Sequence, residues 1–138
     1  MFRVRLITPK GLYEETKNVT LLNVVTLDGQ RGLLSNHMPI VMMLVVSKLT
    51  IVHGKSRVDY AITRGMLYFK DNLAIVLVDA IESKVTIDVA RAIKAKEKAL
   101  RMLNEEVSEW ELNRARYSLE KANNRLKVAG ATNEVHEH

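Results

Sequence analysis

The sequence predicts an antiparallel β-sandwich or barrel followed by a C-terminal antiparallel α-helical hairpin. Up to about Ile81, apolar residues recur with a period of two, which is typical of strands with one buried face. From Thr86 to Gly130 they recur at steps of three and four, which keeps them on one helical face. A chain of 138 residues can bury one good core and a small appendage. We therefore expect one compact domain that carries the hairpin.

The strands are predicted from alternating patterns and from closely spaced turn signals. The alternating apolar sets are Phe2, Val4 and Leu6; Leu49, Ile51 and His53; and Val58, Tyr60 and Ile62. The turn signals are Pro9-Lys10-Gly11, Asp28-Gly29, His53-Gly54-Lys55, Arg64-Gly65 and Lys70-Asp71-Asn72. Many short strands at such spacing are typical of a sandwich or barrel. Residues 73–78 are apolar on both faces, which predicts a central strand.

One loop, residues 28–40, stands out among the turns. Gly29 and Gly32 permit a tight turn, Leu33 and Leu34 are expected to re-enter the core, and a proline stiffens the exit. We interpret this loop as a structural corner. In that interpretation His37 is a hydrogen-bonded corner residue rather than a metal ligand or a base.

The second helix of the hairpin has the clearest end signals. Ser108 and Glu111 have the spacing of a capping box, and Gly130 supplies a left-handed stop. The apolar face of this helix, which we call its seam, is predicted to contain Leu112, Ala115, Leu119, Ala122, Leu126 and Ala129. In the first helix the same period passes through Val85, Val89, Ala92, Ala99 and Leu103. Thr86 is the expected N-cap of that helix.

The domain boundaries follow from these patterns. We expect the sandwich over residues 1–84, the hairpin over residues 85–130 and a frayed polar tail over residues 131–138. The period changes between Glu82 and Thr86, without a glycine or proline linker. Five of the hairpin's predicted seam positions are alanine, and each buries only about one methyl group, near 0.8 kcal/mol. The hairpin should therefore be only modestly stable.

Composition argues against several classes of function. The net charge is +5, but residues 1–84 carry 11 basic and 7 acidic residues and residues 85–130 carry 10 and 7, so no segment is a basic block. The seven aromatic residues do not cluster among arginines, which disfavours nucleic-acid binding.

There is no cysteine, so a disulfide or a thiolate metal site is impossible. The longest apolar run, residues 39–46, is far shorter than the roughly 20 residues that span a bilayer. We expect a chain that is soluble or peripheral to a membrane.

Motifs of catalysis are missing from the sequence. The six glycines form neither GxxxxGK[ST] nor GxGxxG, and the four histidines form no HExxH. The terminal segment Val135-His136-Glu137-His138 is interpreted as part of the tail rather than as a metal site. We predict that the chain is not an enzyme and that it requires no cofactor or metal.

Several motifs resemble one family. Gly29-x-x-Gly32-x-Leu34-x-x-His37-x-Pro39, preceded by Thr8-Pro9-x-Gly11-x-Tyr13, resembles the ε subunit of bacterial F-type ATP synthases. So do residues 61–67, residues 72–82, and the helical segments 87–92 and 122–126. These matches lie in order over about residues 4 to 129. Each motif is weak alone, and their common register makes the match specific.

The resemblance implies a ten-stranded sandwich held by the γ subunit and by the membrane ring of c subunits. It implies a non-catalytic central-stalk subunit of a proton-translocating ATP synthase, peripheral to the cell membrane on its cytoplasmic side. In that family the hairpin lies folded on the sandwich or extends along γ into the α3β3 catalytic head, where it inhibits ATP hydrolysis. In several bacterial members ATP binds the folded hairpin.

The family's nucleotide motif can be carried over residue by residue. It falls on Ile87, Asp88, Arg91 and Ala92, with Glu82 just ahead and Arg125 on the second helix. The two acids would accept from adenine or ribose, and the two arginines would meet phosphates. Lys98 and Lys121 stand where some nucleotide-binding members have arginine, and lysine lacks the bidentate fork.

A structural interpretation of the same residues stays open. The Asp88 carboxylate would interact favourably with the helix dipole from the first turn. Arg91, three residues further on, is placed to form an exposed ion pair with Asp88 worth a few tenths of a kcal/mol. A second function also stays open: a free-standing nucleotide or small-ligand sensor with a helical reporter. Co-purification with γ, α and β subunits separates that sensor from a rotor subunit.

Overall fold

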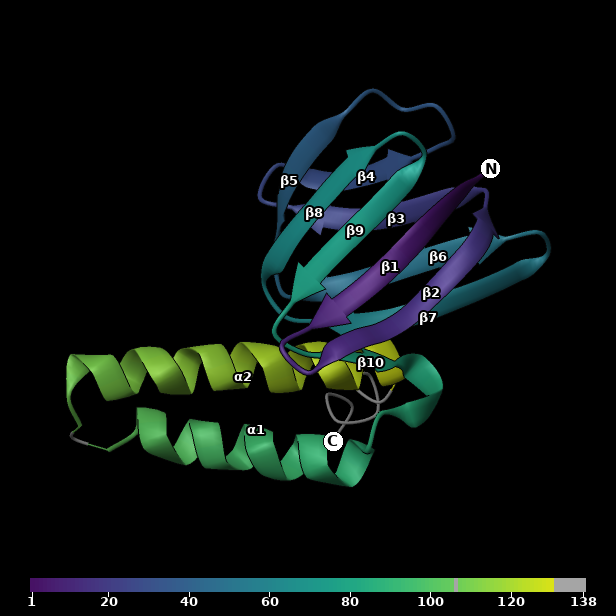
Figure 1. The fold of residues 1–138 in the computed structure, drawn as a ribbon. Coiled ribbons are helices and arrows are strands. Elements are labelled where there is room, and N and C mark those ends of the chain that lie inside the picture. The colour runs from purple at the N-terminus through teal and green to yellow at the C-terminus, as the bar shows by residue number, and fades with distance from the viewer. Residues whose placement is uncertain (106, 131–138) are drawn as a thin grey trace. The chain divides into compact units, whose positions relative to one another are not determined.

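The computed structural model describes residues 1–105 and 107–130, and these form two compact units. The first unit, Met1–Ser83, contains the ten strands, and the second, from Lys84 onward, contains the helices (Figure 1). The predicted β-sandwich with a C-terminal helical hairpin is confirmed. The predicted frayed tail, residues 131–138, lies outside the described residues.

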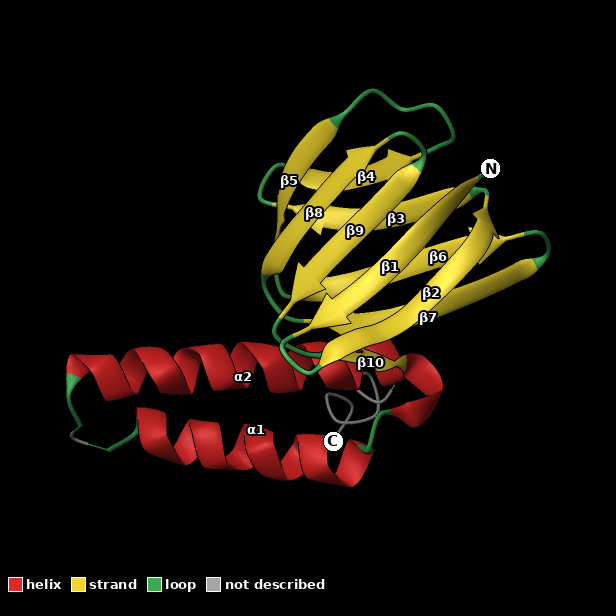
Figure 2. Ribbon diagram, viewed as in Figure 1, coloured by secondary structure: helices red, strands yellow, loops and turns green. Residues whose placement is uncertain are grey.

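The strands of the first unit form one continuous sheet that folds over into two layers (Figure 2). They are β1 (Phe2–Thr8), β2 (Gly11–Val19), β3 (Leu21–Thr26), β4 (Gly29–Leu33), β5 (Ile40–Leu44), β6 (Ser47–His53), β7 (Ser56–Ile62), β8 (Gly65–Lys70), β9 (Leu73–Val78) and β10 (Ile81–Ser83). Their order is β10-β7-β6-β3-β5-β8-β9-β1-β2, with β4 paired to β3. The central position predicted for residues 73–78 is confirmed, because β9 lies between β8 and β1.

The prediction of antiparallel pairing holds with one exception, the parallel pair β1 and β9. Parallel neighbours need a long connection, and the whole of β2 to β8 lies between these two strands in the chain. The predicted turns fall between strands. At Gly65 a Cβ atom would lie 2.1 Å from the carbonyl oxygen of Leu77, so only glycine permits this close approach of β8 to β9.

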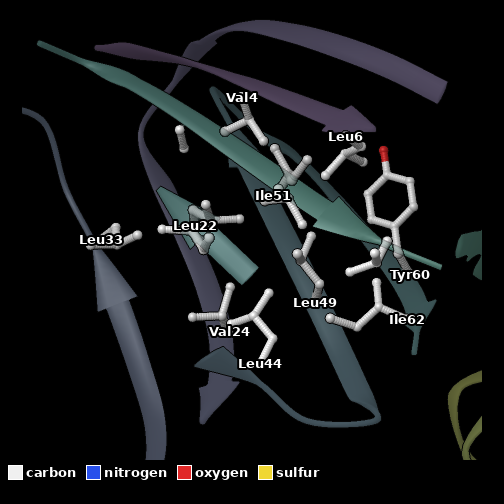
Figure 3. Close-up of a cluster of buried hydrophobic side chains, with 14 of the residues drawn as sticks. Val4, Leu6, Leu22, Val24, Leu33, Leu44, Leu49, Ile51, Tyr60 and Ile62 are labelled. Carbon is white, nitrogen blue, oxygen red and sulfur yellow. The ribbon is translucent and has the colours of Figure 1, made fainter. Parts of the chain in front are cut away.

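The core of the sandwich lies between the two layers and is built from large side chains (Figure 3). The largest that are almost completely buried are Tyr60, Phe2, Phe69, Leu6, Leu22, Leu33, Leu49, Ile51, Ile62 and Leu67. The rings of Phe2 and Phe69 meet edge to face, with 5.5 Å between their centroids. Most of the alternating residues therefore form the core, as predicted; Val58 is partly buried and packs against it, and His53 is only half-buried.

The loop over residues 28–40 contains β4 and then a corner. Leu33 is completely buried, but Leu34 is 59% exposed, so the prediction that both leucines enter the core is wrong for Leu34. The reason is the alternation of side chains along an extended chain, which turns neighbouring residues to opposite sides. The corner role predicted for His37 is confirmed: its Nδ1 lies 2.8 Å from the carbonyl oxygen of Met38, and its ring packs edge to face on Phe69.

The second unit consists of a 3₁₀ turn, η1 (Lys84–Thr86), and two helices, α1 (Val89–Leu103) and α2 (Glu109–Ala129). The N-cap of α1 is Asp88, so the prediction of Thr86 is wrong. Thr86 lies in η1, and the aspartate two residues later accepts the hydrogen bond of the first turn. Val85 is 91% exposed, so it is not part of the seam.

The N-cap serine and the C-terminal glycine predicted for α2 are confirmed, but the reciprocal bond of the capping box is not formed as predicted. The Ser108 side chain accepts a hydrogen bond from the backbone N–H of Glu111, and Gly130 is left-handed with φ of 83°. The Glu111 carboxylate accepts from the Ser108 hydroxyl instead of completing a capping box through the serine's backbone N–H. The buried residues of the two helices are Ala92, Ala99, Ala115, Ala122, Leu126 and Val128.

Candidate functional site

The predicted nucleotide motif begins at the start of α1, where Asp88 caps the helix. Its Oδ1 accepts a hydrogen bond of 3.1 Å from the backbone N–H of Arg91. Both residues are exposed, and Ile87 before them is half-buried. A carboxylate offers about four lone-pair positions, so the cap bond leaves acceptor capacity for a ligand. The same aspartate thus has a definite structural role, whether or not a ligand binds.

Ala92 and Arg125 extend this group across the hairpin. Ala92 is completely buried, so its contribution is its small size, which lets the helices approach closely. Arg125 lies near the end of α2 and is half-buried. The helices run antiparallel, which places the end of α2 beside the start of α1 (Figure 1). Five of the six predicted residues therefore lie on one end of the hairpin.

The sixth predicted residue, Glu82, belongs to the other unit. It lies in β10, where it is the antiparallel partner of Ala61 on β7. Its place in a nucleotide site with the hairpin residues stays a prediction.

A second surface of interest lies on the outer side of the sandwich and consists of Val41 and Met43 on β5, Met66 and Tyr68 on β8, and Leu77 on β9. We call it the apolar face. The strand register makes it continuous: Val41 pairs with Tyr68, Met43 with Met66, and Met66 with Leu77. These side chains are between 36% and 63% exposed. Contiguous exposed apolar side chains on a monomer are typical of protein interaction sites.

Sequence reasoning missed the apolar face, although a signal was present. The signal is the run from Pro39 to Val46, which is apolar at every position. A run that is apolar at every position of a strand must place apolar side chains on both faces. Here Met42 and Leu44 enter the core, while Val41 and Met43 point outward.

No three His, Cys, Asp or Glu side chains within residues 1–105 and 107–130 gather closely enough to hold a metal ion. In the same part of the chain, no helix combines the length and apolarity needed to cross a membrane.

The fold and its surfaces define a class: a β-sandwich with an exposed apolar face, followed by a C-terminal helical hairpin. Residues 1–84 match the family model described as "ATP synthase, Delta/Epsilon chain, beta-sandwich domain", and residues 86–130 match "ATP synthase, Delta/Epsilon chain, long alpha-helix domain". The chain belongs to the ATP synthase delta/epsilon chain family.

Similar curated proteins support the same conclusion. The ATP synthase epsilon chain of Pediococcus pentosaceus is 34% identical over 129 residues, which cover 91% of this chain and 93% of that protein. The ATP synthase epsilon chain of Caldicellulosiruptor bescii is 36% identical over 128 residues, which cover 93% of each chain. The resemblance stated from the sequence motifs is therefore confirmed.

Solved structures share the fold. A chain in the cryo-EM structure of the Euglena gracilis mitochondrial ATP synthase, comprising OSCP, F1 and the c-ring, superposes with a TM-score of 0.75 at 19% identity and covers 98% of this chain and 80% of that chain. A chain in the central stalk and c-ring structure of the Tetrahymena thermophila mitochondrial ATP synthase gives 0.64 at 14% identity, covering 93% and 96%.

Proposed function

We propose that this chain is a non-catalytic central-stalk subunit of a proton-translocating F-type ATP synthase. The observation that carries the proposal is the succession of both family domains in order, over residues 1–84 and 86–130. In this role the sandwich couples the membrane ring of c subunits to the catalytic head, and the hairpin inhibits ATP hydrolysis. The chain acts at the cytoplasmic side of a cell membrane as a peripheral part of the complex.

The apolar face supports the proposal that the sandwich docks on the γ subunit. Five exposed apolar side chains on three paired strands offer a continuous surface. Covering such side chains contributes roughly 25 cal/mol per Å² of apolar area removed from water. A stable, permanent docking partner uses a surface of this kind, because permanent interfaces resemble a core cut in half.

The hairpin supports the proposed inhibitory role through its charge and its weak seam. Its exposed basic residues suit contact with acidic loops of the α3β3 catalytic head: Arg91, Lys94, Lys98, Arg101, Arg114, Arg116 and Lys127. Because its buried side chains are mostly alanines, little hydrophobic free energy opposes a rearrangement of the hairpin.

Regulatory ATP binding is the second part of the proposal. Arg91 and Arg125 would contact phosphates. Asp88 and Glu82 would accept hydrogen bonds from the adenine or ribose. Ile87 and Ala92 would form the apolar side of the ATP site. A ligand at 100 times its dissociation constant adds about 2.7 kcal/mol to the state that it binds. That is enough to select one of two hairpin positions.

Titration calorimetry tests the ATP site directly. We expect weak, magnesium-independent heat of ATP binding to the isolated chain, reduced by Arg91→Ala. The matched control is Arg101→Ala, which removes another exposed arginine of α1 and should leave binding unchanged. An absence of heat at millimolar ATP, with helical circular dichroism intact, would rule the site out.

Truncation after Lys84 tests the rotor and inhibition proposals together. We expect the truncated chain to fold and to assemble into the complex, while ATP hydrolysis rises or loses its dependence on ATP concentration. Truncation after Gly130 is the control, because it removes only residues 131–138. Unchanged hydrolysis in the assembled complex would contradict the inhibitory role. A chain that purifies alone, without γ, α or β subunits, would favour the sensor function instead.

A further inference from the structure

The two ends of the sheet carry a set of side-chain contacts that the proposed function does not use. β2 and β10 stand at opposite ends of the strand order, so each is paired along one edge, β2 with β1 and β10 with β7. β10 is three residues long, and after Ser83 the chain enters η1 and the hairpin. Whatever holds Ser83 therefore fixes the point at which the chain leaves the sandwich.

Tyr13 of β2 reaches across to that point. Its hydroxyl oxygen accepts a hydrogen bond of 3.3 Å from the backbone N–H of Ser83. Its ring meets the ring of Tyr60 on β7 edge to face, with 6.4 Å between centroids and 81° between planes. The next residue, Glu14, accepts a hydrogen bond from the Tyr60 hydroxyl. Side chains thus join two sheet ends that no backbone ladder joins in the described strands.

A β-bulge explains how consecutive residues serve the same junction. In a regular strand, neighbouring side chains point to opposite faces. In the pairing of β1 with β2, Leu6 pairs with Glu14 but Ile7 pairs with Leu12, so Tyr13 is the extra residue. A bulge turns its side chain away from the regular direction. This bulge is what allows both Tyr13 and Glu14 to face Tyr60.

The contacts among Tyr13, Glu14, Tyr60 and Ser83, which we call the junction, include a partly buried hydrogen bond and an exposed one. Tyr60 is 1% exposed, and burial together with its bond to Glu14 raises the pKa of its hydroxyl, which therefore stays protonated and donates. Glu14 is held further by the Thr16 hydroxyl at 3.2 Å. Tyr13 is 41% exposed, so water competes for its bond to Ser83. The Tyr13 to Ser83 bond is the contact of this junction that releases most easily.

We propose that Tyr13 restrains the segment that leads into the hairpin: beside the pairing of β10 with β7, its bond to Ser83 adds a restraint on the last residue of β10, and loss of that bond loosens this segment and changes the distribution of hairpin positions. The proposal rests on the movable hairpin of the proposed function. It adds a regulatory contact within the sandwich, between Tyr13 and Ser83. Neither residue belongs to the proposed ATP site or to the apolar face.

Amide exchange by NMR on the full-length chain is the first test. Tyr13→Phe keeps the ring against Tyr60 and deletes the acceptor, so exchange of the Ser83 amide should become roughly two- to tenfold faster, the range expected for one neutral hydrogen bond. Tyr68→Phe, an exposed tyrosine of β8, is the control and should not change exchange at Ser83. Equal Ser83 exchange in Tyr13→Phe and the parent chain would overturn the proposed restraint.

The second test measures the hairpin itself. The chain has no cysteine, so Lys48→Cys and Asn123→Cys place two spin labels at exposed positions, one in each unit. In pulsed electron resonance, adding Tyr13→Phe should shift population to distances that are minor in the parent. An unchanged distance distribution would overturn the regulatory part of the proposal.

The two tests separate this proposal from the rotor proposal. Both use the isolated chain and do not depend on assembly. If the chain fails to assemble with γ, the rotor function fails, while the exchange and distance results still decide the proposed restraint.

Discussion

The sandwich and the hairpin are stabilised by different kinds of side chain. The sandwich buries phenylalanine, tyrosine, leucine and isoleucine in one continuous core. The hairpin buries four alanines, one leucine and one valine. A buried leucine contributes about 2 kcal/mol and an alanine methyl about 0.8 kcal/mol. We therefore expect the sandwich to be the more stable unit and the hairpin to depend more strongly on its caps.

The largest expected effect is in the sandwich core. Phe69→Ala removes a ring that packs on Phe2 and His37, and we expect it to lower the free energy of unfolding by about 3–5 kcal/mol. Urea denaturation followed by far-UV circular dichroism measures the loss. Tyr68→Ala is the control, because Tyr68 is the neighbour of Phe69 on β8 and is 40% exposed. It should lower the free energy of unfolding much less. Equal losses for the two variants would contradict the assignment of the core.

The second effect is in the alanine seam. Ala115→Leu inserts three carbons at a position that is 1% exposed, and overpacking of this kind costs about 1–3 kcal/mol. Fluorescence of Trp110, the chain's one tryptophan, reports on the hairpin and should show the change. The urea transition of the sandwich should stay where it was, because the substitution lies in the other unit.

The control for the seam is Asn123→Leu, which adds a side chain of the same kind at an exposed position of α2. It should leave the hairpin's stability nearly unchanged. If Ala115→Leu also left the hairpin's stability unchanged, the two helices would not be closely packed at Ala115. The contrast between a tight sandwich and a weak but closely packed hairpin would then fail.

The sequence predicted the parts of the fold that depend on local pattern. Alternation located the strands, and the serine and glycine signals located both ends of α2, because these rules act within a few residues. The parallel pairing of β1 with β9 escaped prediction, since it is a contact between residues about 70 positions apart. The N-cap at Thr86 was wrong because two polar residues compete there, and the local geometry favours Asp88.

The candidate sites divide in the same way. Ile87, Asp88, Arg91 and Ala92 were predicted from a contiguous motif, and the structure places them on one end of the hairpin with Arg125. The apolar face and the Tyr13 junction were not predicted. The apolar run of residues 39–46 indicates exposed apolar side chains on β5, but the strands that extend this face are set by strand order, and the Tyr13 junction is set by strand order and a bulge, which no short pattern encodes.

The third effect tests how much the hairpin relies on its caps. Ser108→Ala removes the acceptor of the Glu111 backbone N–H and should destabilise α2 by about 1 kcal/mol. Thermal unfolding followed at 222 nm measures this loss. Ser118→Ala, in the interior of the same helix, is the control and should be neutral or slightly stabilising, since alanine is the better helix former. If both serine variants behaved alike, capping would not distinguish the hairpin from the sandwich.

The smallest expected effect is a pH dependence of the sandwich at Arg5 and Glu15. The Arg5 side chain lies 2.6 Å from the Glu15 carboxylate, and this hydrogen bond holds the pKa of that carboxyl below its usual value. Folding therefore favours the ionised form. The stabilisation is present above the ordinary carboxyl pKa of 4.5 and is lost as pH falls through the lowered value.

Urea midpoints measured between pH 7 and pH 3 should reveal this contribution as a difference between the parent chain and Glu15→Gln. The difference should be small, because the pair is partly exposed and exposed ion pairs are screened by water and salt. It should shrink toward zero at the acid end, where the parent's carboxylate is protonated as well. Glu97→Gln, on the exposed side of α1, should not change the sandwich's transition at any pH. A difference that grew on acidification would mean that the ionised carboxylate opposes folding, and the Arg5–Glu15 pair would then contribute nothing to the stability of the sandwich.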